Sequence, residues 1–166
     1  MSTTVISNVL NVDTFWTWAV AQWSDSILAA EMMALQEEHD CVVLELLLMG
    51  WLGRQHWAVS PAAHQQLADM ATSWVDGVVL PLRRTRRSWR GIDALESQRQ
   101  QLQNLELQGE YALAQLYFGA LGNLDSSELV QAEEPMVIDN LHIALASTHT
   151  TIVPQRILAL AALLSK

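Results

Sequence analysis

Five arginines lie close together in the middle of the chain, and their spacing suits the binding of an anion. Residues three and four positions apart share one face of a helix, so most of these side chains would project together. A guanidinium group presents a planar fork of donors that matches carboxylate and phosphate oxygens. An aromatic side chain beside arginines can stack on a base or another side chain. The predicted partner-binding residues are Arg83, Arg84, Arg86, Arg87, Trp89 and Arg90.

The alternative is that these arginines neutralise carboxylates of the same chain. The sequence holds 18 acidic and nine basic residues, which gives a formal net charge of −9. This acidic excess argues against nonspecific nucleic-acid binding by the whole molecule, although a local contact with a nucleic-acid backbone stays open. The carboxylates considered as internal partners are Glu31, Glu37, Glu38, Glu96 and Glu106.

Glu45 is the second candidate, because it is the only charged residue of the apolar run Cys41–Leu52. A buried carboxylate is costly unless it is neutralised or paired, and in a cleft it can mark a functional site. An ion pair with an arginine is the structural explanation. The functional explanation is an internal pocket for a flat or lipid-like ligand, although tryptophans more often simply fill a core. The residues predicted to line this pocket are Glu45, Trp18, Trp51 and Trp74.

No pattern typical of a catalytic or metal site stands out. There is no glycine-rich phosphate loop and no GxSxG elbow, and the five histidines are not grouped with carboxylates at ligand spacing. A single cysteine, Cys41, together with an N-terminus unlike a secretory signal, predicts a cytoplasmic protein. We expect no cofactor and no metal ion, and we favour a binding protein over an enzyme.

The elements that position these residues are predicted to be helices. The run Cys41–Leu52 is shorter than the roughly 20 residues needed to cross a bilayer, and a helix apolar on all sides is typical of a core. Gly50 and Gly53 would let a neighbouring segment approach the end of this helix. Pro81 lacks a backbone donor and predicts a kink or a break ahead of the arginine segment. No segment predicts a strand with confidence.

These patterns predict an all-α fold: a single-domain helical bundle of six or seven helices around a buried central helix at about residues 40–54. We expect residues 1–11 to form a flexible N-terminal arm and residues 12–166 to form the single helical domain, since a chain of 166 residues fits one domain. No apolar segment is long enough for a transmembrane helix. Residues 154–166 are apolar on nearly every side, which predicts either a homodimer contact or insertion among the other helices.

Several blocks of sequence follow one another in a recognisable order. They are Phe15-Trp16-Thr17-Trp18-Ala19, Leu35-Gln36-Glu37-Glu38-His39, Leu46-Leu47-Leu48 with Trp51-Leu52, Trp74, Pro81-Leu82-Arg83 and Arg86-Arg87. In these blocks, over about residues 13–118, the chain resembles an uncharacterised proteobacterial family of small all-helical proteins, a domain of unknown function. The resemblance implies a helical fold and brings no established activity. It also implies an Asp and an Asn at the start of the central helix, where this chain has Val42 and Leu44.

Taken together, the residues predict a non-enzymatic binding or regulatory protein that contacts an acidic protein or an anionic ligand through segment 83–90. The alternative is an enzyme, or a bundle that binds a small molecule or lipid in the pocket around Glu45. A closed core with outward arginines would favour the first function, and a cavity with Glu45 in its wall would favour the second.

Overall fold

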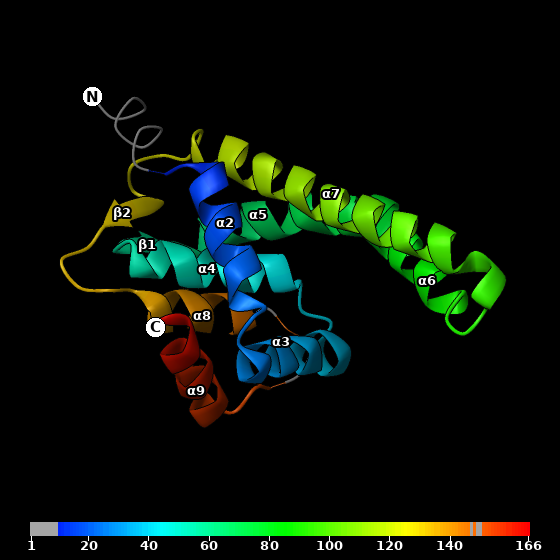
Figure 1. Ribbon diagram of the computed structural model, residues 1–166. Coiled ribbons are helices and arrows are strands. Elements are labelled where there is room, and N and C mark those ends of the chain that lie inside the picture. Colours follow the sequence, from blue (N-terminus) through cyan, green and yellow to red (C-terminus); the bar gives the residue numbers. More distant parts are fainter. Residues whose placement is uncertain (1–9, 147, 149–150) are drawn as a thin grey trace.

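The computed structural model describes residues 10–146, 148 and 151–166, and this part of the chain is mostly helical (Figure 1). It contains seven helical rods if the uninterrupted helical segment 61–88 is counted once, which confirms the predicted all-α bundle. The elements are α2 (Val12–Gln22), α3 (Ser26–His39), α4 (Val43–Arg54), β1 (Trp57–Val59), α5 (Pro61–Trp74), η1 (Val75–Val79), α6 (Leu80–Ser88), η2 (Asp93–Leu95), α7 (Glu96–Leu121), β2 (Leu129–Gln131), α8 (Val137–Ala146) and α9 (Pro154–Leu164).

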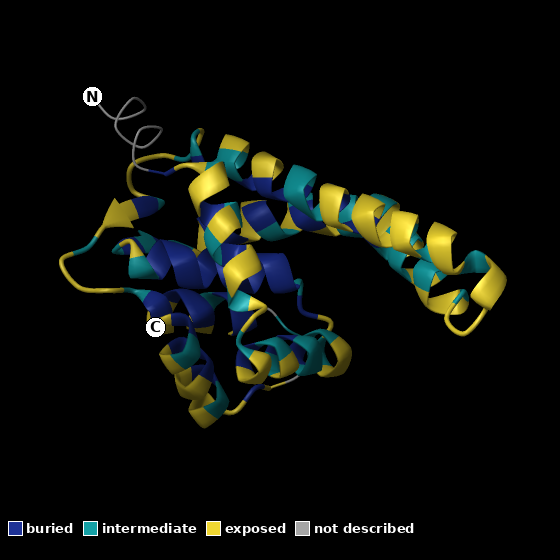
Figure 2. Cartoon of the chain, viewed as in Figure 1, coloured by how far each residue is buried: buried dark blue, intermediate teal, exposed yellow. Residues whose placement is uncertain are grey.

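Helix α4 is the buried centre of the bundle, as predicted. Eleven of its 12 residues are buried, and Figure 2 shows it dark along its whole length. Helices α2, α3, α8 and α9 all pack against it. Because a helix without a polar face cannot lie at a surface, each of these neighbours covers a different side of α4.

Two glycines near the end of α4 allow this close packing. The Gly53 carbonyl accepts a hydrogen bond from the Met136 amide at 2.9 Å, just before α8 begins. A Cβ atom at position 53 would lie 2.5 Å from the Val137 backbone nitrogen, so no larger residue fits there. Gly50 faces the side chain of Leu164 in α9 in the same way. The predicted close approach is therefore made by α8 at Gly53 and by α9 at Gly50.

Asn140 of α8 connects three elements at the centre of the core. Its side chain is fully buried and donates to the carbonyls of Met49 at 3.2 Å and Trp57 at 2.8 Å. Its Oδ1 accepts from the Val59 amide at 3.1 Å. One side chain thus satisfies backbone groups of α4 and β1 that would otherwise be buried without partners.

A small antiparallel sheet was not predicted. β1 and β2 have three residues each and pair with Trp57 opposite Gln131 and Val59 opposite Leu129. A strand of three residues is too short to show the alternation by which strands are recognised in a sequence. Strand β1 follows α4 and β2 follows α7, so the sheet brings together two segments that are far apart in the sequence.

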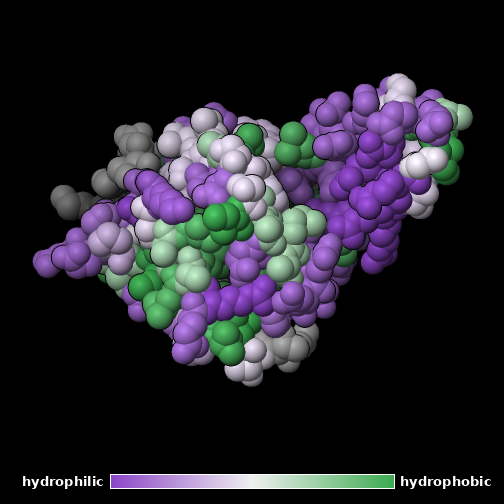
Figure 3. Space-filling view, turned by 60° about the horizontal axis from the view of Figure 1, so that its bottom comes forward, coloured by the Kyte–Doolittle hydropathy of each residue, from purple (hydrophilic) through white to green (hydrophobic). Residues whose placement is uncertain are grey.

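Of the kink or break predicted at Pro81, the break is wrong, because α5 runs on into α6. The two helices are joined by the π-helical turn η1, in which the Leu80 amide bonds the Val75 carbonyl five residues back. A π turn shifts the pattern of donors and acceptors by one residue, so the helix can pass a proline without ending. Together α6 and the first half of α7 form an arm that projects from the body, and its visible face is mostly hydrophilic (Figures 1 and 3).

The two ends of the chain were each the subject of a prediction. The expected flexible arm over residues 1–11 lies mainly outside the described residues, although Asn11 caps α2 by accepting from the Asp13 and Thr14 amides. In α9 the apolar side chains Ile157 and Leu160 are buried within the chain's own core. The homodimer through 154–166 stays a prediction, and it would use the outer face of this helix.

Substitution of Gly53 provides a test of the close contact between α4 and α8. We expect Gly53→Ala to lower the free energy of unfolding by about 2–3 kcal/mol, because the new methyl group meets backbone that cannot rotate away. Gly119→Ala is the matched control, since open space surrounds that position on α7 and alanine favours a helix. Chemical denaturation of both variants measures the difference. Equal stability of the two variants would contradict the packing described here.

Candidate functional site

Two arginines of α6 are paired with carboxylates of α7. Arg83 Nε lies 2.7 Å from Glu106 Oε1, and its Nη2 lies 2.9 Å from Glu110 Oε1. Arg86 Nε lies 2.6 Å from Glu106 Oε2. Glu106 was one of the five carboxylates considered as internal partners. For these paired arginines, Arg83 and Arg86, neutralisation within the chain is therefore the observed arrangement.

Burial and charge act in opposite directions on the two carboxylates. Burial raises the pKa of Glu106, but hydrogen bonds and charge from Arg86 and Arg83 outweigh it, and the net pKa is lowered. The pKa of Glu110 is raised, because its burial outweighs the effect of Arg83. The contacts with Arg83 and Arg86 therefore favour the ionised form of Glu106.

The other three arginines of the predicted set are exposed. No carboxylate lies within ion-pair distance of Arg84, Arg87 or Arg90 in the described part of the chain. Arg84 and Arg87 are three residues apart on α6, whereas Trp89 and Arg90 lie just beyond its end at Ser88. We refer to Arg84, Arg87 and Arg90 as the unpaired arginines.

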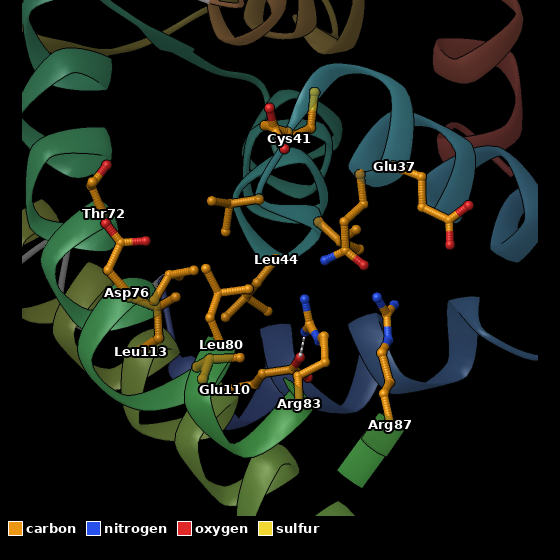
Figure 4. Close-up of a pocket in the computed structure, with 16 residues that line it drawn as sticks. Glu37, Cys41, Leu44, Thr72, Asp76, Leu80, Arg83, Arg87, Glu110 and Leu113 are labelled. Carbon is orange, nitrogen blue, oxygen red and sulfur yellow. Dashed lines mark hydrogen bonds and ion pairs between the residues drawn. The ribbon is translucent and has the colours of Figure 1, made fainter. Parts of the chain in front are cut away.

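A first cavity of about 590 Å³ opens where α3 ends and α4 begins, facing η1 and α6 (Figure 4). Arg83 and Arg87 extend from α6 toward the start of α4, while Thr72 and Asp76 form another wall. No side chain caps α4, and in the described chain the amides of its first two residues have no hydrogen-bond partner. The charged residues that line this cavity are Glu37, Asp40, Asp76, Arg83, Arg87 and Glu110.

A second cavity of about 440 Å³ lies on the other side of the same arginines. It shares Arg83 and Arg87 with the first cavity and adds Arg86. Its remaining lining is largely apolar and comes from α2, α3, α4 and α7. The apolar lining residues are Trp16, Ala19, Val20, Trp23, Met33, Val43, Leu44, Leu47 and Leu107.

Comparison with known proteins identifies the family. Residues 14–116, more than half of the chain, match a family described as "Protein of unknown function (DUF2390)". The chain belongs to the DUF2390 family. No curated protein and no solved structure matches it.

The DUF2390 segment contains every residue that lines either cavity. Strand β2 and helices α8 and α9 lie beyond it; α8 and α9 pack against α4, and β2 pairs with β1. Val42 and Leu44, where the resemblance implied an Asp and an Asn, are both in the wall of the first cavity. In this chain those two positions contribute apolar surface.

Glu45 is buried, as predicted, but its partner is not an arginine. Its Oε1 lies 2.7 Å from Nε2 of the buried His64, and the Tyr117 hydroxyl donates to its Oε2 at 3.4 Å. Neither of the two cavities is lined by Glu45, Trp18, Trp51 or Trp74, so the pocket around these residues stays a prediction.

The three tryptophans of that predicted pocket have structural contacts instead. Trp51 meets the Phe15 ring edge-on with 5.6 Å between centroids, and Arg54 lies over the Trp18 ring at 5.9 Å. Trp74 Nε1 donates to the Gly109 carbonyl at 2.8 Å and so fixes α5 to α7. These contacts support the core-packing explanation for all three.

Cys41 contributes a thiol to the wall of the first cavity. Burial, with the nearby Glu45 charge, raises the pKa of the Cys41 thiol to about 11, so the thiol is neutral at pH 7 and a poor nucleophile. Among the described residues, no cluster of His, Cys, Asp and Glu side chains could hold a metal ion. No helix in this part of the chain is both long and apolar enough to cross a membrane.

The apolar wall of the second cavity was not predicted from the sequence. Trp16, Val20 and Trp23 follow one another at helical spacing of four and three, but Phe15 and Trp18, which pack toward α4, also lie three residues apart. With apolar residues on both faces of α2, the spacing alone does not identify the face that lines a cavity. Leu107 was missed for the same reason within the glutamine-rich helix α7.

Removal of the Glu106 carboxylate tests the electrostatic contact within the arm. At neutral pH we expect Glu106→Gln to lower the free energy of unfolding by on the order of 2–3 kcal/mol, because Arg86 loses its carboxylate partner and Arg83 keeps only Glu110. Glu96→Gln, which removes an exposed carboxylate paired with Arg99 on the same helix, should change stability much less.

The effect of Glu106→Gln should depend on pH in a defined direction. The folded pKa of Glu106 is below its unfolded value, so its stabilisation is present above about pH 4.3 and is lost as the pH falls through the folded pKa. Denaturation curves of wild type and variant should therefore converge in acid. A constant gap between the curves from neutral pH into acid would contradict this assignment.

Proposed function

We propose that this protein is a non-enzymatic binding or regulatory protein that contacts an acidic protein partner through the arginine segment 83–90. The observation that carries the proposal is the division of the five arginines into two sets. Arg83 and Arg86 are paired with Glu106 and Glu110, whereas the other three are exposed and have no acidic partner among the described residues.

The surroundings of the unpaired arginines support this function. They stand on an arm that projects from the body and whose visible face is mostly hydrophilic, so a partner could reach them without moving the core (Figures 1 and 3). The paired arginines bind α6 to α7 and thereby hold the segment in place. Preorganised guanidinium groups lose less entropy when they bind a carboxylate.

An acidic protein segment suits this surface better than a nucleic acid. The net charge of −9 would repel a long polyanion at a distance, whereas a short acidic segment meets only the local positive charge. Trp89, half-buried beside Arg90, adds an aromatic surface against which a side chain can pack.

The proposal is tested with the triple variant R84Q/R87Q/R90Q and a fluorescently labelled oligoglutamate peptide. Fluorescence anisotropy should report binding to wild type that weakens as salt is added, since exposed charges are screened. The variant should bind about tenfold more weakly, because three exposed charge pairs are lost.

A matched control separates local charge from net charge. S126E/S127E/Q155E changes the net charge by the same amount at exposed positions away from the arm, and it should bind the peptide nearly as wild type does. Equal weakening by both triple variants would contradict a specific surface. Tighter binding of an oligonucleotide of equal charge would contradict a protein partner.

A further inference from the structure

The second cavity is a groove with an apolar wall and a cationic end. Its apolar rim includes Val20, Trp23 and Leu107, whose side chains are 47%, 44% and 49% exposed, and Leu47 of α4 lines the same groove. Large apolar side chains that gather around a concave surface are typical of a binding site. We propose that this groove binds a small anionic ligand with an apolar body, such as a medium-chain or aromatic carboxylate.

Arg87 is the group that would receive the anionic end. It lines both cavities, extends toward the start of α4 (Figure 4), and has no carboxylate partner in the described chain. Arg83 and Arg86, in the same wall, form ion pairs with Glu106 and Glu110, so the positive charge of these two arginines is largely neutralised. One guanidinium therefore remains to form charge-assisted hydrogen bonds with a ligand.

The start of α4 adds a second favourable contribution beside Arg87. Its cap position is Val42, which has no side-chain hydrogen bond to offer, and no partner for the Val43 and Leu44 amides is found in the residues described. Both of these residues line the two cavities. The positive end of a helix favours a negative charge, in addition to the charge of Arg87.

Charge also decides which way the ligand would lie. Asp40 and Asp76 line the first cavity and would repel an anion placed deep within it. The carboxylates that line the second cavity, Glu106 and Glu110, are paired with Arg83 and Arg86, and most of its remaining lining is apolar. The anionic group therefore lies at the junction beside Arg87, and the apolar body extends into the second cavity along Trp23 and Leu107.

The size of the groove favours a small molecule over a protein segment. Its volume of about 440 Å³ falls within the roughly 300–1,000 Å³ typical of sites for small ligands. The inference goes beyond the proposed partner binding and shares only Arg87 with it.

The probe for this site is anilinonaphthalene sulfonate, an aromatic anion whose fluorescence rises on transfer to an apolar surface. Wild-type protein should bind it saturably at one site per chain. Dodecanoate should displace the probe. Dodecanol, which lacks the charge, and acetate, which lacks the apolar body, should displace it much less.

Two matched pairs of variants locate the site. Leu107→Ala should weaken probe binding several-fold and Leu116→Ala should not, although both leucines are exposed on α7 and only Leu107 lines the groove. Arg87→Gln should weaken the affinity for dodecanoate about tenfold, whereas Arg84→Gln, on the same helix but outside both cavities, should not. Circular dichroism checks that each variant is folded.

The outcomes separate this inference from the proposed function. Equal probe affinity of R87Q and R84Q, or of L107A and L116A, would overturn the groove as the ligand site. Displacement by dodecanol as effective as by dodecanoate would overturn the anionic ligand class. Loss of oligoglutamate binding in R84Q with unchanged probe binding would support both assignments, because Arg84 belongs only to the partner surface.

Discussion

The burial requirement of α4 is the constraint on which the rest of this structure depends. A helix of leucine, valine, methionine, glycine and tryptophan has no side that can face water, so other elements must cover it around its whole circumference. Helices α2 and α3 do so from the N-terminal part of the chain, and α8 and α9 from the C-terminal part. The glycines at positions 50 and 53 bring the last two helices close enough to leave no gap.

The buried polar groups that connect the helices of this core have hydrogen-bond partners, whereas Trp57 Nε1 is buried without one among the described residues. Asn140 satisfies backbone groups of α4 and β1, and Glu45 is held between His64 and Tyr117. An unpaired polar group in such surroundings would cost several times what a satisfied one contributes, so these contacts specify how the helices are arranged. Both cavities reach α4 at its first turn, through Val43 and Leu44.

The prediction of the central helix and of the all-α bundle needed only local information, because a run such as Cys41–Leu52 is apolar whatever surrounds it. The pairing of Arg83 and Arg86 with Glu106 was among the alternatives considered from charge balance. The His64 partner of Glu45 was not foreseen, since it lies 19 residues away on another helix and nothing in the sequence relates the two. The cavities could not be predicted from the sequence either. Several elements form their walls, and only the tertiary packing determines which side of each element faces a cavity.

The order of the covering helices along the chain has a consequence for biosynthesis. Helix α4 ends at Arg54, but α9, which packs against Gly50, ends only at Leu164. A ribosome therefore releases the most completely buried helix long before the last segments that shield it, and the nascent chain must carry this exposed surface through most of translation. We expect the growing chain to depend on a holding chaperone during that interval, and a chain that terminates before α8 to aggregate instead of reaching a compact state.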